Sequence, residues 1–149
     1  MKFINLASNK SAWRGYEYYT GNRVNYHISC GNSEYRGKVC GNGRTYDVHI
    51  NIEHPRSSSC NCPHAEGKRI VCKHMVALYF SIFPDVAKEY ISLVEEAERE
   101  QEEYWDEIED RLIKKINKMT KSDLQNALYS LLMDGPEWQF ERFVSEYVE

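Results

Sequence analysis

The chain contains no long apolar run, and this absence argues against a membrane-spanning helix. No apolar stretch approaches the roughly 18–20 residues that a helix needs to cross a bilayer. The N-terminal residues also lack the apolar stretch of a signal peptide. We therefore expect a cytoplasmic protein. In that reducing compartment clustered cysteines more often bind a metal than form disulfides, and the chain has five.

Acidic residues are scarce in the first half of the chain and abundant in the second. Residues 1–84 contain 11 Lys and Arg against 5 Asp and Glu, whereas residues 85–149 contain 8 against 18. The formal charges of the two parts are +6 and −10, which add to −4 for the whole chain. This asymmetry predicts two domains with different roles, residues 1–84 and residues 85–149.

Apolar and polar residues alternate in the first domain, which predicts strands. The three segments with this pattern are residues 24–30, 35–40 and 46–52. Gly31-Asn32 and Gly41-Asn42-Gly43 separate them, and Gly and Asn tolerate the backbone of tight turns. We expect a small antiparallel meander. A short helix is predicted before it at residues 11–19, with Gly21 ending that helix.

The remaining segments predict helices. Residues 75–83 are apolar nearly all round, as in a short buried helix, and Pro84 should end it. Residues 85–119 contain no Gly or Pro and repeat apolar side chains at helical spacing, which predicts one helix of roughly 50 Å. Ser122-Asp123-Leu124-Gln125 resembles a capping box that opens another helix. Gly135-Pro136 should start the last one.

The chemical centre of the sequence is Cys60-Asn61-Cys62, followed by Cys72-Lys73-His74. These four potential ligands lie in a polar segment that has few apolar residues to hold it. Zinc prefers four thiolate or imidazole ligands at tetrahedral corners. Four protein ligands leave no corner for water, so we expect a structural site. The alternative is that the cysteines are small buried hydrophobic residues.

The short spacings also predict the local backbone. Alternate residues of an extended strand point to opposite faces, so Cys60 and Cys62 can share a metal only if the chain bends there, and Pro63 fits a bend. Cys72 should lie just before the helix of residues 75–83, with His74 in its first turn. The partly positive helix N-terminus would favour the Cys72 thiolate.

The C-x-C…C-x-H pattern, with Tyr46-Asp47-Val48 before it and a short apolar helix after it, resembles the SWIM zinc finger. The segment at residues 14–24 is similar to the lead-in of bacterial SWIM proteins, so the resemblance covers about residues 10–84. It implies a ββα-type zinc fold that binds DNA or protein. The larger hosts of this finger, helicase-like ATPases and transposases, are not expected here, because the sequence has no P-loop and no transposase-length domain.

Other chemistry-bearing residues offer weaker alternatives. His64-Ala65-Glu66 matches the H-x-E of zinc deaminases, but the P-C-x-x-C that follows in those enzymes is missing. His64 remains a possible substitute ligand for His74. Cys30 and Cys40 end neighbouring predicted strands and could face each other across a hairpin, and we expect them to be core or strand packing residues.

Basic residues accompany the predicted hairpin and metal loop. They are Arg36, Lys38, Arg44, Arg56, Lys68, Arg69 and Lys73. They are candidates for a phosphate-binding patch, with Tyr35 or Tyr46 available to stack on bases. Ordinary solvated charge is the alternative.

Together these features predict an α+β fold, in which a small zinc-clamped antiparallel sheet with a helix precedes a helical C-terminal region. We expect a binding module rather than an enzyme, with structural Zn²⁺ and with nucleic acid or protein as its partner. No membrane or small-molecule substrate is expected. The competing hypothesis is a protein–protein adaptor that binds through the acidic helices.

Overall fold

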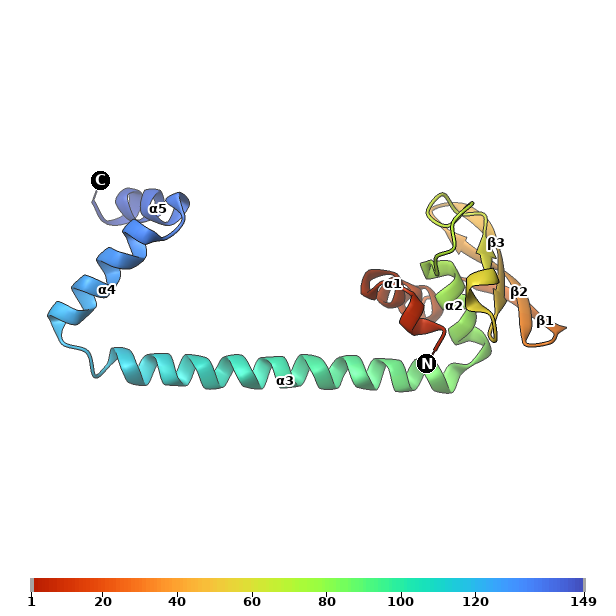
Figure 1. Ribbon diagram of the computed structural model, residues 1–149, viewed down its shortest axis with the longest axis horizontal. Coiled ribbons are helices and arrows are strands. Elements are labelled where there is room, and N and C mark those ends of the chain that lie inside the picture. Colours follow the sequence, from red (N-terminus) through yellow and green to blue (C-terminus); the bar gives the residue numbers. More distant parts are fainter. Residues whose placement is uncertain (1, 149) are drawn as a thin grey trace. The chain divides into compact units, whose positions relative to one another are not determined.

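The computed structural model describes residues 2–148 and divides the chain into two compact units, Met1–Glu95 and Glu96–Glu149. Figure 1 shows their helices and strands. The first unit contains a four-stranded antiparallel sheet and all the residues that are buried within the described range 2–148. The second unit is helical. The predicted α+β fold is confirmed.

The sheet has the strand order β1-β2-β3-β4, and each strand is antiparallel to its neighbour. Its strands are β1 (Val24–Gly31), β2 (Glu34–Gly41), β3 (Arg44–Asn51) and β4 (Ser59–Cys60). The first three are the predicted meander. The fourth is a two-residue strand in the segment that the sequence presents as a polar loop, and it places Cys60 opposite Val48.

Helix α2 (Lys73–Ile82) forms the centre of the first unit. It packs against α1 (Asn9–Thr20) on one side and against the sheet on another (Figure 1). Seven of its ten residues are buried, which explains a helix that is apolar nearly all round. Helix α1 closely approaches α2 at Gly15, where a Cβ atom would collide with the side chain of Val76.

Two short 3₁₀ turns and the start of α3 complete this unit. The turns are η1 (Ile4–Leu6) and η2 (Pro55–Ser57), and α3 spans Pro84–Ile116. Pro84 thus separates two helices, ending the α2 region and beginning α3. Ala87 and Tyr90 of α3 join the hydrophobic core of the first unit.

Helix α1 ends at Gly21 as predicted, but α4 begins at a different residue. Gly21 is the C-cap of α1, its N–H donates to the Glu17 carbonyl at 2.9 Å, and the left-handed residue that follows is Asn22, with φ 52°. The helix α4 (Lys121–Asp134) is capped by Thr120, whose hydroxyl accepts from the Asp123 N–H while the Asp123 carboxylate accepts from the Thr120 N–H. The predicted capping box at Ser122 is therefore wrong by two residues.

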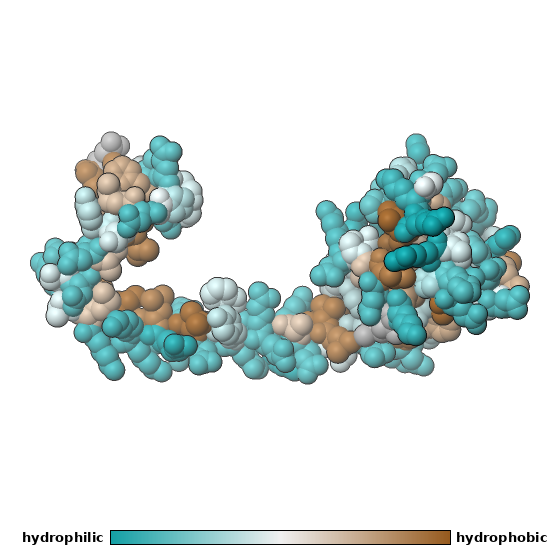
Figure 2. Space-filling view, in the orientation of Figure 1, coloured by the Kyte–Doolittle hydropathy of each residue, from teal (hydrophilic) through white to brown (hydrophobic). Residues whose placement is uncertain are grey.

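The second unit is the C-terminal part of α3 with α4 and α5 (Glu137–Tyr147). None of its residues from 96 to 148 is buried. Apolar side chains lie on its surface, as the brown areas along these helices show in Figure 2. Within residues 2–148, no helix is both long enough and apolar enough to span a membrane.

Candidate metal centre

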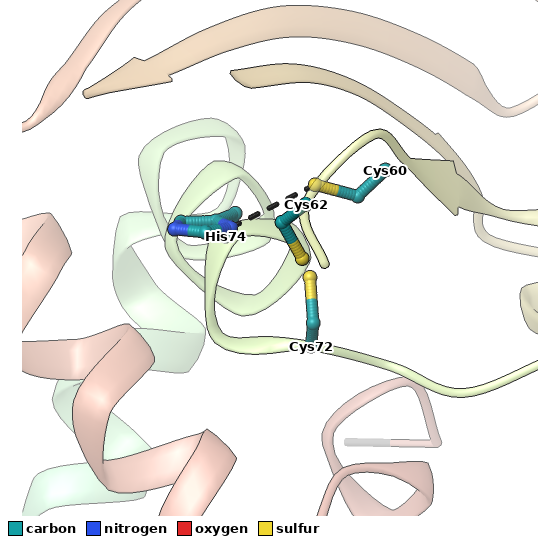
Figure 3. A group of neighbouring side chains, drawn as sticks. All are labelled: Cys60, Cys62, Cys72 and His74. Atoms are coloured by element: carbon teal, nitrogen blue, oxygen red, sulfur yellow. Dashed lines mark hydrogen bonds between the residues drawn. The ribbon is translucent and has the colours of Figure 1, made fainter. Parts of the chain in front are cut away.

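The structure brings the four predicted ligands together. Cys60 is on β4, Cys62 follows it, Cys72 precedes the first residue of α2, and His74 lies in the first turn of that helix. Their ligand atoms are all within 4.8 Å of one another, and all four residues are buried (Figure 3). The four side chains therefore offer a compact set of three sulfurs and one imidazole.

The bend that allows Cys60 and Cys62 to converge is held by Asn61. Its side-chain oxygen accepts a hydrogen bond from the Asp47 N–H at 3.0 Å, and its own N–H donates to the Asp47 carbonyl at 3.3 Å. Beyond Pro63, the N–H groups of Ala65 and Glu66 both donate to the Cys62 carbonyl. The chain thus turns back immediately after the second cysteine, as predicted from Pro63.

The ionisation of the three cysteines is strongly coupled, because their thiol groups are close together. A hydrogen bond from the Cys60 thiol lowers the pKa of Cys72 to about 4, with further help from His74 and the Met75 N–H. The same interaction with Cys72 raises the pKa of Cys60, and burial raises that of Cys62. Three thiolates so close together would repel one another, so full deprotonation needs a bound positive ion.

His74 is fixed between two aromatic rings. The Tyr46 ring stacks on it with centroids 4.3 Å apart and an interplanar angle of 21°, and the Tyr18 ring lies 5.4 Å away. Its Nδ1 faces the Cys60 sulfur at 3.7 Å (Figure 3). This orientation makes Nδ1 the nitrogen that can hold a metal together with the sulfurs.

The other nitrogen of His74, Nε2, is buried without a hydrogen-bond partner among the described residues. Gly41 leaves the space beside it, because a Cβ atom there would lie 3.2 Å from Nε2 and 2.9 Å from the Tyr18 hydroxyl. Metal-bound histidines usually donate their second N–H to an oxygen. Here aromatic packing, rather than a hydrogen bond, orients the ring.

The donor set fits a soft divalent ion. Thiolate and imidazole are the ligands of structural zinc sites, whereas hard ions such as Mg²⁺ and Ca²⁺ prefer oxygen. Within residues 2–148, no carboxylate belongs to the cluster. Among the described residues, His64 does not join it either, and its side chain is exposed.

A cleft of about 460 Å³ adjoins the metal cluster. Cys62, Cys72 and His74 form part of its wall, and the first turns of α1 and α2, the β2–β3 hairpin and the metal loop contribute the rest. Three cationic side chains line it, namely Lys10, Arg14 and Lys73, and no Asp or Glu does. The first two were not predicted as site residues, because the fold rather than the sequence brings them to the metal loop.

The seven predicted basic residues do not form one patch. Lys73 lines the cleft, where its ammonium donates to the Tyr18 hydroxyl at 2.6 Å and lies 4.2 Å from the ring centre. Arg56, Lys68 and Arg69 instead line a second groove, which also contains Asp47 and Glu66. Acidic side chains thus offset part of the charge in that groove.

The other predicted basic residues lie on the sheet. Gly37 and Val39 of β2 are buried, and the alternation of side chains directs Arg36 and Lys38 to the opposite face. Lys38 pairs with Asp47 at 3.6 Å. Arg44 begins β3, just after the hairpin turn.

Cys30 and Cys40 are not paired with each other in the sheet. Cys40 is opposite Thr45, and its thiol donates to the Asn25 side chain at 3.3 Å, whereas Cys30 lies at the other end of β1 and is exposed. The two cysteines therefore do not face each other, because in an antiparallel hairpin the end of one strand is opposite the start of the next.

Comparison with protein families finds one match, and it covers the metal loop. The family model of the SWIM zinc finger matches residues 46–83. This segment of the chain is similar to the SWIM zinc finger. The match begins at Tyr46 and ends just after α2, so it contains all four residues of the cluster and confirms the resemblance drawn from the sequence. No curated protein and no solved structure matches the chain.

Proposed function

We propose that the finger holds one structural Zn²⁺ through Cys60, Cys62, Cys72 and His74. The observation that carries this proposal is the buried Cys₃His cluster, whose ligand atoms lie within 4.8 Å of one another. Bound zinc would join β4 to the start of α2 and hold the loop between them. Since four protein ligands fill a tetrahedral site, the module binds rather than catalyses.

Metal analysis of purified protein tests this assignment. Cys62→Ser should lose the zinc, whereas Cys30→Ser, which changes an exposed cysteine outside the cluster, should keep one zinc per chain. Both variants remove one thiol, so thiol number cannot explain a difference between them. Full zinc content in Cys62→Ser would contradict the assignment.

We further propose that the finger binds the phosphate backbone of nucleic acid in the cleft beside the metal. Lys10, Arg14 and Lys73 line this cleft, and none of them forms an ion pair among residues 2–148. Cations without carboxylate partners attract phosphate, and the N-termini of α1 and α2 add partial positive charge. The groove around Arg56 is the weaker candidate, since it includes two carboxylates.

The positions of the two candidate stacking residues, Tyr35 and Tyr46, also favour the cleft. Tyr35 is half-buried and packs edge-on against Phe83, with ring centroids 5.7 Å apart, so it is less available to stack on a base. Tyr46 lines the cleft, with one ring face against His74. It is therefore the better placed of the two tyrosines for contact with a nucleotide.

Binding of the full chain to fluorescent single-stranded DNA, double-stranded DNA and RNA tests this proposal. Lys10→Glu/Arg14→Glu should weaken binding by about tenfold or more. The slope of log affinity against log salt concentration should fall by the equivalent of roughly two phosphate contacts. Lys88→Glu/Arg99→Glu makes the same charge change on exposed positions of α3 and should have a much smaller effect. Equal losses in both variants would show that only net charge matters.

A protein–protein adaptor is the second candidate function. It is favoured by the exposed apolar side chains of the second unit, among them Trp105, Leu128 and Trp138. If the full chain binds no nucleic acid even at low salt, the adaptor hypothesis replaces the nucleic-acid hypothesis. The zinc assignment would stand in either case.

A further inference from the structure

Apolar side chains form an uncovered stripe on α3 within the second unit. Tyr104, Ile108 and Leu112 follow one another at intervals of four residues, and Trp105 and Ile116 lie beside them on the same side of the helix. Tyr104, Trp105 and Leu112 are more than half exposed, at 58%, 58% and 55%. Exposed stripes of this kind mark surfaces that another helix covers.

The stripe is not covered by a core of its own unit. None of the residues from 96 to 148 is buried, and α4 and α5 expose large apolar side chains as well. Helices in water are marginally stable without tertiary packing. A second helical surface is therefore needed to stabilise this unit.

The charges along the same helix show which surface fits. Residues 96–110, here called the acidic segment, contain nine Asp or Glu and one Arg. Residues 111–121, the basic segment, contain five Lys or Arg and no acid; Arg111, Lys114 and Lys115 lie on α3, and Lys118 and Lys121 follow its end. Within the described chain, one ion pair joins the two segments, from Lys114 to Asp110 at 3.8 Å. The other charges of both segments remain available to a partner.

We propose that α3 pairs with α3 of a second copy of this chain in antiparallel orientation. Two copies that cross near Ile108 place the acidic segment of each beside the basic segment of the other. The stripes of both copies then face each other around Trp105, Ile108 and Leu112. A parallel pair would instead align the acidic segments and repel. This pairing is independent of the zinc and of the nucleic-acid proposal.

Sedimentation equilibrium of the full chain tests the pairing. The wild type should have twice the 17.6 kDa mass of one chain at micromolar concentration and physiological salt. Leu112→Glu should raise the dissociation constant at least tenfold, because it places a charge in the stripe. Leu93→Glu, which also changes an exposed leucine of α3 but lies outside the two segments, should have little effect.

Charge exchange tests the orientation. Replacing Lys114, Lys115 and Lys118 with Glu should abolish the homodimer, and so should replacing Glu100, Glu102 and Glu103 with Lys. A mixture of these two variants should form a heterodimer, and one chain that carries all six changes should dimerise again. That recovery separates loss of attraction from loss of folding.

A wild type that remains monomeric at 100 micromolar would overturn the proposal. A dimer that is unaffected by Leu112→Glu and by charge exchange would also overturn it, because its interface would then lie elsewhere. Circular dichroism should show the helix content of the wild type for the chain with all six changes. It should show the same for the mixture of the two charge-exchange variants.

Discussion

Gly15→Ala tests how closely α1 packs on α2. In the structure a Cβ atom at residue 15 would collide with Cβ and Cγ1 of Val76 and lie 3.0 Å from the Lys73 carbonyl oxygen. Val76 is fully buried, so its side chain has no free space to move into. The same contact sets the position of Arg14 on the cleft wall.

Two opposing effects determine the change in the free energy of unfolding. Alanine is favoured over glycine inside a helix by up to about 1 kcal/mol. Inserting a methyl group into a packed core costs about 1–3 kcal/mol. Since the collision involves a buried side chain and a backbone oxygen, we expect the cost to exceed the gain. Gly15→Ala should destabilise the first unit by about 1–2 kcal/mol.

Hydrogen exchange of the zinc-loaded protein measures this change at the slowest amides of α2. Val76→Ala alone should cost about 2 kcal/mol, because it removes two methyl groups and leaves a small cavity. The double variant should lose about 1 kcal/mol less stability than the sum of the two single losses. Alanine at residue 76 relieves the collision with Cγ1 but keeps the one with Cβ. A Gly15→Ala variant as stable as the wild type would refute the close approach of the two helices.

Three further predictions follow from other parts of the structure. Thr120→Ala should lower the stability of α4 by about 1 kcal/mol, measured by exchange of its first-turn amides, and Ser122→Ala, outside the capping box, should have less effect. Hydrogen bonds from Asn51 and His49 lower the pKa of Glu34, so its ionised form stabilises the sheet above pH 4.5, and the difference in melting temperature between wild type and Glu34→Gln should shrink as the pH falls from 6 to 4. Removal of zinc with EDTA should leave the circular dichroism of the second unit helical, whereas complete loss of helix would show that both units depend on the metal.

The meander and the metal loop could be predicted because their signals are local. Alternating side chains define β2 and β3 within a few residues, and the four ligands occupy one short polar segment. The bend between Cys60 and Cys62 could be predicted from geometry. The side chain that holds this bend, Asn61, could not, because its partner Asp47 is distant in sequence.

The cleft could not be predicted, because it depends on the packing of distant segments. Lys10 and Arg14 reach the metal loop only because Gly15 lets α1 approach α2. The helix start at Thr120 was also ambiguous, since Thr120 and Ser122 both precede a residue that can complete a capping box. Local sequence offers both sites, and the structure forms the hydrogen bonds of the first.

The effect of zinc on nucleic-acid binding distinguishes geometry from net charge. Three thiolates and one Zn²⁺ carry about −1, and the metal-free cluster, with Cys72 ionised and the other two thiols protonated, carries about −1 as well. Net charge alone therefore predicts similar binding of nucleic acid with and without the metal. The structure predicts tighter binding by the zinc-loaded protein, because Cys62, Cys72 and His74 form the cleft wall that holds Lys73 near Lys10 and Arg14.

We expect zinc-loaded protein to bind a fluorescent oligonucleotide at least several-fold more tightly than protein treated with chelator at the same ionic strength. Restoring zinc should restore the affinity in the wild type. The Lys10→Glu/Arg14→Glu variant should show little gain on zinc loading, since its cleft no longer attracts phosphate. Equal or tighter binding by the metal-free wild type would contradict a phosphate site in the cleft and leave only nonspecific attraction to the basic half of the chain.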